Sequence, residues 1–244
     1  MTYCVGLRLN RGLVFMSDTR TNSGVDNVSQ YRKMFTWSKP GERAIVLLSA
    51  GNLATSQAVV SLLDERSKAP ADRNPSILEA PTMFQVVRLV GQTLREVIAT
   101  YADAGEKADS GFRSTLVVGG QIAGMTPRLF LVYPEGNFIE AGDDTPFMQI
   151  GETKYGRPIL VRAYNPDMSF EDAAKLLLVS FDSTIKANLS VGPPIDLQVY
   201  EADSFLLEPS VRIEEDDPYY RSISTGWSDA LRSAFNALPD FEFD

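Results

Sequence analysis

After Met1, the chain begins with Thr2-Tyr3-Cys4-Val5-Gly6-Leu7-Arg8-Leu9, a segment typical of a β-strand. Methionine is normally removed when the next residue is this small, so we expect the mature chain to begin at Thr2. A terminal threonine carries a free α-amine beside its hydroxyl, and the pKa of such an amine is about 7.7–8.0. Because this amine is a base, it activates the neighbouring oxygen as a nucleophile. The segment therefore predicts a strand whose first residue is a candidate catalytic group.

The absence of histidine removes most competing mechanisms. The chain has 244 residues and contains no histidine. Ser-His-Asp and Cys-His catalysis need an imidazole, and the H-E-x-x-H zinc site needs two. The single cysteine, Cys4, cannot form a thiolate metal cluster, and the glycine motifs of nucleotide-binding proteins are missing. We therefore expect a protein that needs neither a metal nor a cofactor.

Composition indicates a folded, acidic protein with 44% hydrophobic residues and a formal charge of −9. No apolar segment is long enough to cross a bilayer, and the N-terminus lacks the pattern of a secretion signal. One cysteine excludes an internal disulfide, which favours a reducing, cytoplasmic setting. Nucleic-acid phosphates attract concentrated lysine and arginine side chains, whereas this chain is acidic overall. We expect a cytoplasmic protein with no membrane and no nucleic-acid partner.

Strands and helices are expected in blocks. Strands are predicted over 2–10, 13–18, 33–38, 44–50, 115–120, 129–133, 138–140 and 195–202. Helices are predicted from Asn52 to about Ser67, from Thr82 onward, and from Ser169 to about Asn188, with a loop over 68–81. This order differs from the alternation of a parallel β-α-β sheet. It favours an α+β fold in which two antiparallel sheets pack face to face between helices, a four-layer αββα sandwich.

The chain is expected to divide near residue 213. Residues 1–213 are predicted to form the sandwich domain. Residues 214–244 contain an acidic linker and a helix from about Tyr219 to Leu238. We expect this extension to pack on the domain or on a neighbouring copy.

Hairpin geometry places Asp18 beside Thr2. If the first two strands pair one to one across the Arg11-Gly12 turn, Thr2 lies near residues 18–21. Each residue also has a simpler interpretation: threonine is common after methionine, aspartate often satisfies backbone donors at a strand end, and Lys33 suits a solvated strand edge. Together they form a coherent set, because a lysine cation favours ionisation of a hydroxyl and an aspartate fixes the lysine.

Four motifs resemble those of proteasome β-type subunits. They are Thr2-x-x-x-Val5-Gly6, Gly12-Leu13-Val14-Phe15-Met16-Ser17-Asp18-Thr19-Arg20, Arg32-Lys33-Met34-Phe35 and Ser49-Ala50-Gly51. That family belongs to the N-terminal nucleophile hydrolases, which have an αββα sandwich. The N-terminus, the segment 151–160 and the acidic C-terminal extension are similar to those of the Anbu (ancestral β subunit) branch. The likeness is most specific over residues 1–50 and extends over most of the chain.

The resemblance implies roles for individual residues. Thr2 corresponds to the nucleophile, and Asp18 and Lys33 to the pair that tunes it. Lys33 is one residue closer to Thr2 than in the usual pattern, a difference that the loop 19–32 can absorb. Gly51 corresponds to the residue whose backbone N–H supports the oxyanion. A simple turn from strand to helix is the alternative interpretation of this glycine.

The supporting residues depart from the family pattern. Proteasome β subunits usually present an aspartate and a serine, in D-x-x-S-G, near the terminal amine. The matching region here has Asn188 in place of the aspartate and Ser190 displaced by one. Where the family often has Gly-Ser-Gly, this chain has Gly151-Glu152-Thr153.

The resemblance implies a threonine-type peptidase or amidase that cleaves peptide or amide bonds. It also implies a self-compartmentalising homo-oligomer, either a ring or an open spiral, and does not specify an ATPase partner. The altered supporting residues leave two alternatives open: a non-peptidase amidase of narrow specificity, and a proteasome-like assembly protein with weak catalysis.

Overall fold

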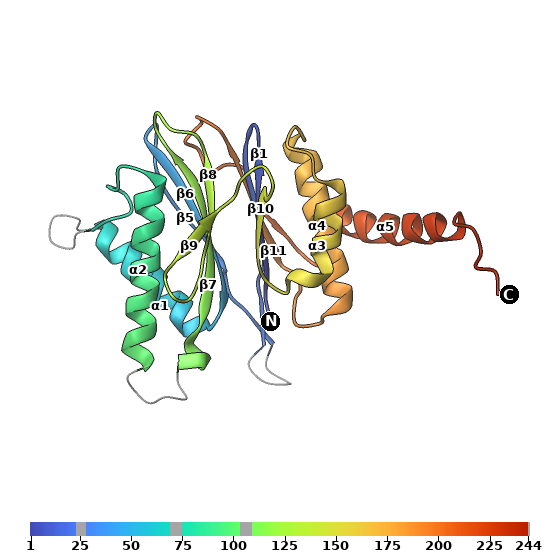
Figure 1. The fold of residues 1–244 in the computed structure, drawn as a ribbon, viewed down its shortest axis with the longest axis horizontal. Helices are drawn as coiled ribbons and strands as arrows, with labels where there is room; N and C mark the ends of the chain where they lie inside the picture. The colour runs from blue at the N-terminus through green and yellow to red at the C-terminus, as the bar shows by residue number, and fades with distance from the viewer. Residues whose placement is uncertain (23–27, 69–74, 103–108, 244) are drawn as a thin grey trace.

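Two five-stranded antiparallel sheets form the centre of the molecule (Figure 1). The computed structural model describes the chain except residues 23–27, 69–74, 103–108 and 244. The first sheet contains, in order, β10 (Phe147–Gly151), β1 (Tyr3–Leu9), β2 (Gly12–Asp18), β11 (Ile195–Glu201) and β12 (Ser210–Ile213). The second contains β5 (Met34–Lys39), β6 (Arg43–Gly51), β7 (Ser114–Ile122), β8 (Arg128–Val132) and β9 (Phe138–Glu140).

Helices cover the outer face of each sheet. Helices α1 (Leu53–Lys68) and α2 (Met83–Ala102) lie on the second sheet, and α3 (Thr153–Ala163) and α4 (Phe170–Ala187) lie on the first (Figure 1). A short 3-10 helix, η1 (Asp109–Phe112), precedes β7. The predicted αββα sandwich is confirmed.

Three apolar clusters hold the four layers together. One joins α1 and α2 to the second sheet and includes Leu47 and Val86. Another lies between the sheets and includes Cys4 and Phe15. In the third, Val5 and its neighbours pack against α3 and α4. Strand β1 is buried on both faces for this reason, and its sequence is therefore almost continuously apolar.

Helix α3 and strands β10 and β12 of the sandwich are not among the predicted elements. Helix α3 was not predicted because it contains Gly156 and Pro158, which both oppose helix formation. Its packing overrides that propensity: a side chain at Gly156 would collide with Ser180 and Tyr3. Strands β10 and β12 are short and were also not predicted.

The predicted loop 19–32 contains two short paired strands. Strand β3 (Arg20–Asn22) pairs with β4 (Val28–Gln30), and residues 23–27 lie outside the described residues. For the predicted loop 68–81, Lys68 still belongs to α1, and residues 69–74 lie outside the described part.

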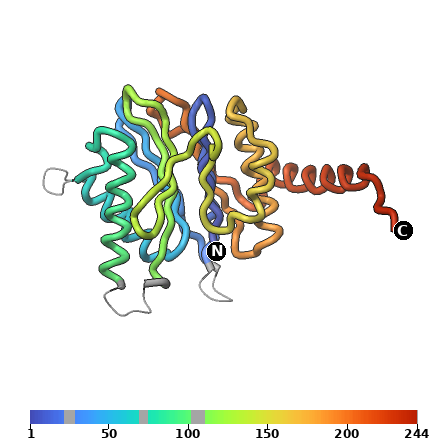
Figure 2. Tube along the Cα trace, viewed as in Figure 1, coloured from blue at the N-terminus to red at the C-terminus, as the bar shows by residue number. Residues whose placement is uncertain are grey.

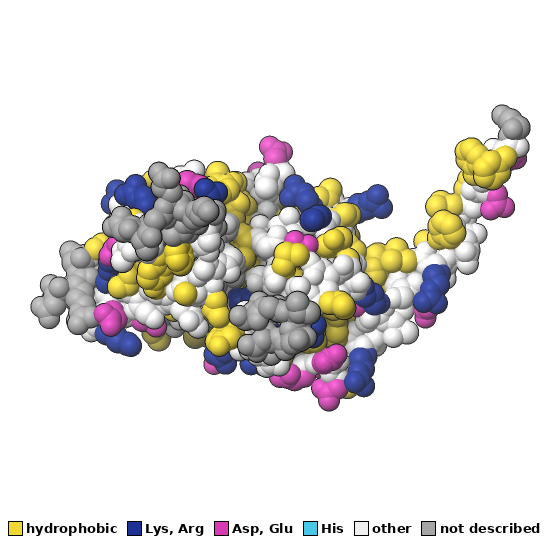
Figure 3. Space-filling model, turned by 90° about the horizontal axis from the view of Figure 1, so that it is seen from below, with side chains coloured by type: hydrophobic (Ala, Val, Ile, Leu, Met, Phe, Trp, Pro, Cys, Tyr) yellow, Lys and Arg dark blue, Asp and Glu magenta, His cyan; other side chains and the backbone are white. Residues whose placement is uncertain are grey.

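The last helix, α5 (Pro218–Asn236), projects away from the sandwich beside α4 (Figures 1 and 2). Asp217 caps it by accepting a hydrogen bond from the Tyr220 N–H, and Tyr220 itself is buried. Further along, apolar side chains are exposed on this arm (Figure 3), namely Leu231, Phe235, Leu238, Phe241 and Phe243. Of the helices in the described residues, none combines the length and apolar character needed to span a membrane.

Candidate active site

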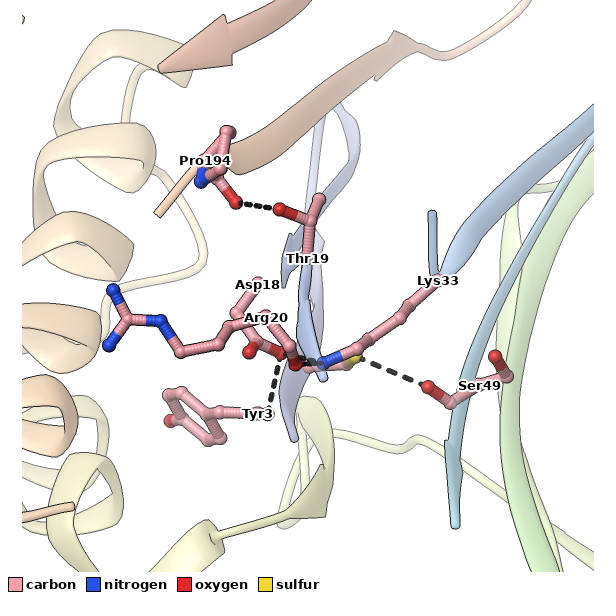
Figure 4. Close-up of polar contacts among 8 residues, drawn as sticks. Tyr3, Asp18, Thr19, Arg20, Lys33, Ser49 and Pro194 are labelled. Carbon is pink, nitrogen blue, oxygen red and sulfur yellow. Dashed lines mark hydrogen bonds and ion pairs between the residues drawn. The ribbon is translucent and has the colours of Figure 1, made fainter. Parts of the chain in front are cut away.

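The first residues of β1 lie at the end of the first sheet where β2 finishes, between β2 and β10. The hairpin pairs Cys4 with Ser17, so Tyr3 and Asp18 are the next neighbours along the ladder. The Tyr3 N–H donates to Asp18 Oδ1 at 3.0 Å (Figure 4). Asp18 therefore lies beside the chain segment that contains Thr2, as the hairpin geometry predicted.

Strand β10 fixes the backbone of Thr2 from the other side. Tyr3 pairs with Gly151, and the Glu152 N–H donates to the Thr2 carbonyl oxygen at 2.7 Å. Gly151 has a φ of +83°, and a Cβ at this position would lie 1.8 Å from the same oxygen. Only glycine permits this close approach, so Gly151 determines where Thr2 lies.

Lys33 reaches the same place from the second sheet. It directly precedes β5, and its Nζ lies 2.8 Å from Asp18 Oδ1 and donates to the Arg20 carbonyl oxygen at 2.6 Å (Figure 4). The side chains of Lys33 and Asp18 are 5% and 0% exposed. Two opposite charges are thus held together away from water, an arrangement that needs both partners to be stable.

Burial changes the proton affinity of these groups. It raises the pKa of Asp18 above its ordinary value, and the adjacent Lys33 ammonium and the Tyr3 N–H oppose this shift. Burial also lowers the pKa of the Met1 α-amine, and Lys33 lowers it further. The carboxylates of Asp18 and Glu152 act in the opposite direction on this amine. The amino end of β1 is therefore surrounded by charges of both signs.

Thr2, Lys33 and Gly51 line one cavity of about 320 Å³, together with Glu152. Gly51 ends β6 directly before α1, with a φ of +117°. A Cβ there would lie 2.5 Å from the Arg113 carbonyl oxygen. This crowded turn from strand to helix explains the glycine by itself, and it leaves Gly51 in the wall of the cavity that contains Thr2.

The two remaining predicted residues lie behind this wall. Asn188 ends α4, and its Nδ2 donates to Glu152 Oε2 at 3.1 Å. The Ser190 N–H donates to Asn188 Oδ1 at 3.0 Å. Glu152 lines the cavity, whereas Asn188 contacts it only through Glu152, and Ser190 only through Asn188.

The structure adds two residues to those found in the sequence. In the sequence, Glu152 was noted only as a departure from a family pattern. It lies next to Thr2 because β10 pairs with β1. Arg20 accepts the Lys33 hydrogen bond through its carbonyl, while its guanidinium donates to the Leu189 carbonyl oxygen at 3.0 Å. Gly192 leaves room for that guanidinium. Arg20 therefore ties the 188–192 segment to the site, although its place in the motif Asp18-Thr19-Arg20 was the only sequence signal.

Within the described residues, no group of three or more Asp, Glu or Cys side chains is arranged to hold a metal ion. The described polar groups of the site are instead an ion pair, a second carboxylate with its amide partner, and the backbone of β1. Such groups are suited to moving a proton next to a nucleophile.

Comparison with known proteins gives consistent results. The family model for proteasome subunits matches residues 2–199. Proteasome subunit β2 from Pyrobaculum calidifontis is 25% identical over 206 residues, which cover 81% of this chain and 87% of that protein. An Anbu (Gly-1) mutant from Hyphomicrobium sp. strain MC1 has a similar structure, with 53% identity, a TM-score of 0.91 and complete coverage (100%) of both chains. The Anbu complex from Pseudomonas aeruginosa, described as a helical assembly, has 47% identity, a TM-score of 0.91 and 98% coverage of both chains.

Proposed function

Because this chain belongs to the proteasome subunit family, within its Anbu branch, we propose that it is an N-terminal threonine hydrolase of peptide or amide bonds. The observation that carries the proposal is the shared cavity of Thr2, Lys33 and Gly51, backed by the buried pair of Lys33 with Asp18. A hydroxyl beside a lysine cation, at the start of a strand, has the surroundings that a terminal threonine nucleophile needs.

The proposed reaction begins once Met1 has been removed. The α-amine of Thr2 takes the hydroxyl proton while Oγ1 bonds to the substrate carbonyl carbon, and the carbonyl electron pair moves to its oxygen. The Gly51 N–H stabilises this oxyanion. When the intermediate collapses, the C–N bond breaks, and the ammonium of Thr2 gives its proton to the leaving nitrogen. An ester on Thr2 remains.

Water completes the cycle. The free amine of Thr2 takes a proton from water as the water oxygen bonds to the ester carbonyl carbon. The amine then returns this proton to Oγ1 as the C–O bond breaks and the carboxylic acid leaves. Lys33 shares the cavity with Thr2, where a cation favours the oxyanion form of the hydroxyl, and Asp18 holds Lys33 in place. No metal or cofactor enters this scheme.

The variant Thr2→Ala tests the nucleophile. We expect intact mass to show loss of Met1 in the parent protein and covalent labelling by a threonine-directed electrophile. Thr2→Ala should lose the label, and hydrolysis should fall about a thousandfold or more with unchanged circular dichroism. Retained hydrolysis in the variant, or retained Met1 in the parent, would contradict the mechanism.

A peptide library separates the proposed activity from its alternatives. Cleavage of many library members supports a peptidase. A protein that is labelled at Thr2 but cleaves no library peptide is the amidase of narrow specificity. A protein that is neither labelled nor active is the assembly protein with weak catalysis.

The proposal includes self-association in a cytoplasmic setting. Support comes from the helical assembly of the similar Pseudomonas aeruginosa complex and from the exposed apolar side chains of α5. We propose an open spiral in which a second copy of this chain covers that arm. The single cysteine, Cys4, is buried and free, which suits a reducing compartment.

A further inference from the structure

Glu152 is a buried carboxylate that no cation neutralises in the described structure. It is 8% exposed and lines the cavity with Thr2. Within the described part of the chain, its side-chain partner is the neutral amide of Asn188, and no lysine or arginine forms an ion pair with it. Burial of a charge is costly unless a partner of opposite sign is nearby. The position therefore calls for a cation.

The orientation of this carboxylate is fixed by two hydrogen bonds. Asn188 Oδ1 accepts from the Ser190 N–H at 3.0 Å, so Asn188 turns its Nδ2 towards Glu152 and donates at 3.1 Å. Glu152 also occupies the N-cap position of α3, yet its side chain makes no capping hydrogen bond. Its carboxylate is thus directed away from the helix end, towards Asn188 and the cavity.

The backbone brings Glu152 to the start of β1. Its N–H donates to the Thr2 carbonyl oxygen at 2.7 Å. The ionisable groups around this corner are Asp18 at the end of β2, Lys33 before β5, and Glu152 after β10, whereas α4 contributes the neutral Asn188. Asp18 and Lys33 already neutralise each other at 2.8 Å. The Arg20 guanidinium is bound to the Leu189 carbonyl oxygen. The remaining cation at this corner of the described structure is the terminal amine, on which the charge of Glu152 already acts.

We propose that Glu152 is a positioning residue that binds the α-amine of Thr2 in its ammonium form, with Asn188 holding the carboxylate. This inference rests on the proposed function. The family pattern places an aspartate near the amine at the position of Asn188. In this chain the carboxylate belongs instead to Glu152, the hydrogen-bond partner of Asn188. The negative charge has moved from the end of α4 to the start of α3.

The consequence for the reaction follows from charge. Glu152 stabilises the ammonium that forms when Thr2 transfers its hydroxyl proton to the amine, so it raises the proton affinity of that base. The effect of Glu152 on the Met1 amine has the same sign. Lys33 acts against it. Removal of the Glu152 charge should therefore lower the pKa of the amine and weaken the base.

The test compares the parent with Glu152→Gln, after intact mass has confirmed that Thr2 is terminal. Trinitrobenzenesulfonate reacts with an amine only in its unprotonated form. Its rate of reaction at the N-terminal amine, followed by mass spectrometry of the N-terminal peptide against pH, therefore gives the amine pKa without any hydrolysis. We expect a midpoint about 1 pH unit lower in Glu152→Gln. In active protein, the acid limb of kcat/KM should move in the same direction, and its plateau should fall by up to about tenfold.

Two further variants separate positioning from structural damage. Glu171→Gln removes the same charge at the opposite end of α4, about 25 Å from Asn188, and should leave the midpoint unchanged. The double variant Glu152→Ser with Asn188→Asp returns the carboxylate to the usual side and should restore the parent midpoint.

An equal midpoint in Glu152→Gln and the parent overturns the inference. If the parent has a terminal Thr2 but hydrolyses no substrate, the proposed function fails, while the amine titration still decides the role of Glu152. Retention of Met1 overturns both.

Discussion

Lys33 and Asp18 depend on each other because both are almost completely buried. Replacing one partner leaves an isolated charge, and such losses cost about 3–5 kcal/mol. This loss of stability depends on pH, since the carboxyl of Asp18 becomes neutral when it takes up a proton. Burial already raises the pKa of Asp18, and Lys33 is the main group that opposes the shift.

The variant Lys33→Met should therefore be less stable and should lose stability as pH rises. Without the lysine, the pKa of Asp18 in the folded state rises further, so the folded chain keeps a proton that the unfolded chain releases above its ordinary pKa of 3.8. Stability decreases with pH wherever the folded state binds more protons. Denaturant unfolding from pH 4 to pH 7 measures this slope.

Asp18→Asn in the Lys33→Met background is the control. It removes the titrating group, so the slope above about pH 4 should disappear. Equal slopes in the single and double variants would show that Asp18 is not the group responsible.

Sequence alone was informative for residues linked by a short hairpin. The two-residue turn is Asn10-Arg11, one residue before the predicted Arg11-Gly12, because Gly12 already pairs with Leu9. The shift is small, so the position of Asp18 beside the start of β1 was still predictable. Lys33 and Gly51 came from family motifs. Glu152 was not assigned a role, because its position depends on a pairing between residues 3 and 151 that no local pattern encodes.

At the scale of elements, the pairing of β10 with β1 depends on Gly151. Its φ of +83° is unfavourable for other residues, and the space for a side chain is filled by the Thr2 carbonyl. A positive φ and a lack of space for a side chain do not always occur together. Gly41 also has a positive φ, +69°, but a Cβ there would meet nothing within 4 Å.

Gly151→Ala should be more damaging than Gly41→Ala. In both variants the positive φ at a non-glycine residue destabilises the folded state by about 1–3 kcal/mol. Only Gly151→Ala must also displace Thr2 and the N–H of Glu152, so it alone should lower hydrolysis and labelling at Thr2. Thermal unfolding and electrophile labelling measure the two effects, and equal labelling of both variants would contradict this role of Gly151.

The predictability of the elements follows the strength of their periodicity. Helix α2 was predicted because its apolar residues recur at helical spacing, and Val86, Val90 and Leu94 are indeed buried. Helix α3 contains a glycine and a proline, and its stability comes from packing on α4 and Tyr3, which is a tertiary effect. Strand β12 has a mainly exposed sequence and forms only because β11 is beside it.

At the scale of the whole molecule, α5 is buried against its own domain mainly at its start. Tyr220 anchors its start in the domain, whereas Trp227, Leu231 and Phe235 follow at spacings of four residues along one face. Phe235 is 75% exposed. A continuous apolar stripe of this kind is typical of a surface that another chain covers.

Phe235→Asp should weaken self-association, because it places a charge within the apolar stripe. Ser233→Asp adds the same charge two residues earlier, which lies roughly on the opposite face of the helix, and should have no effect. Light scattering over a dilution series gives the mass of each species. Equal masses for both variants and the parent would exclude α5 as the contact.

The pair of Lys33 and Asp18 also has a consequence for the life of a newly made chain. Asp18 belongs to one sheet and Lys33 directly precedes β5 of the other, so their ion pair exists only when the two sheets are docked. A partly folded chain has a threonine at its start but no lysine beside it. The proposed nucleophile therefore acquires its neighbouring lysine only when the two sheets have come together.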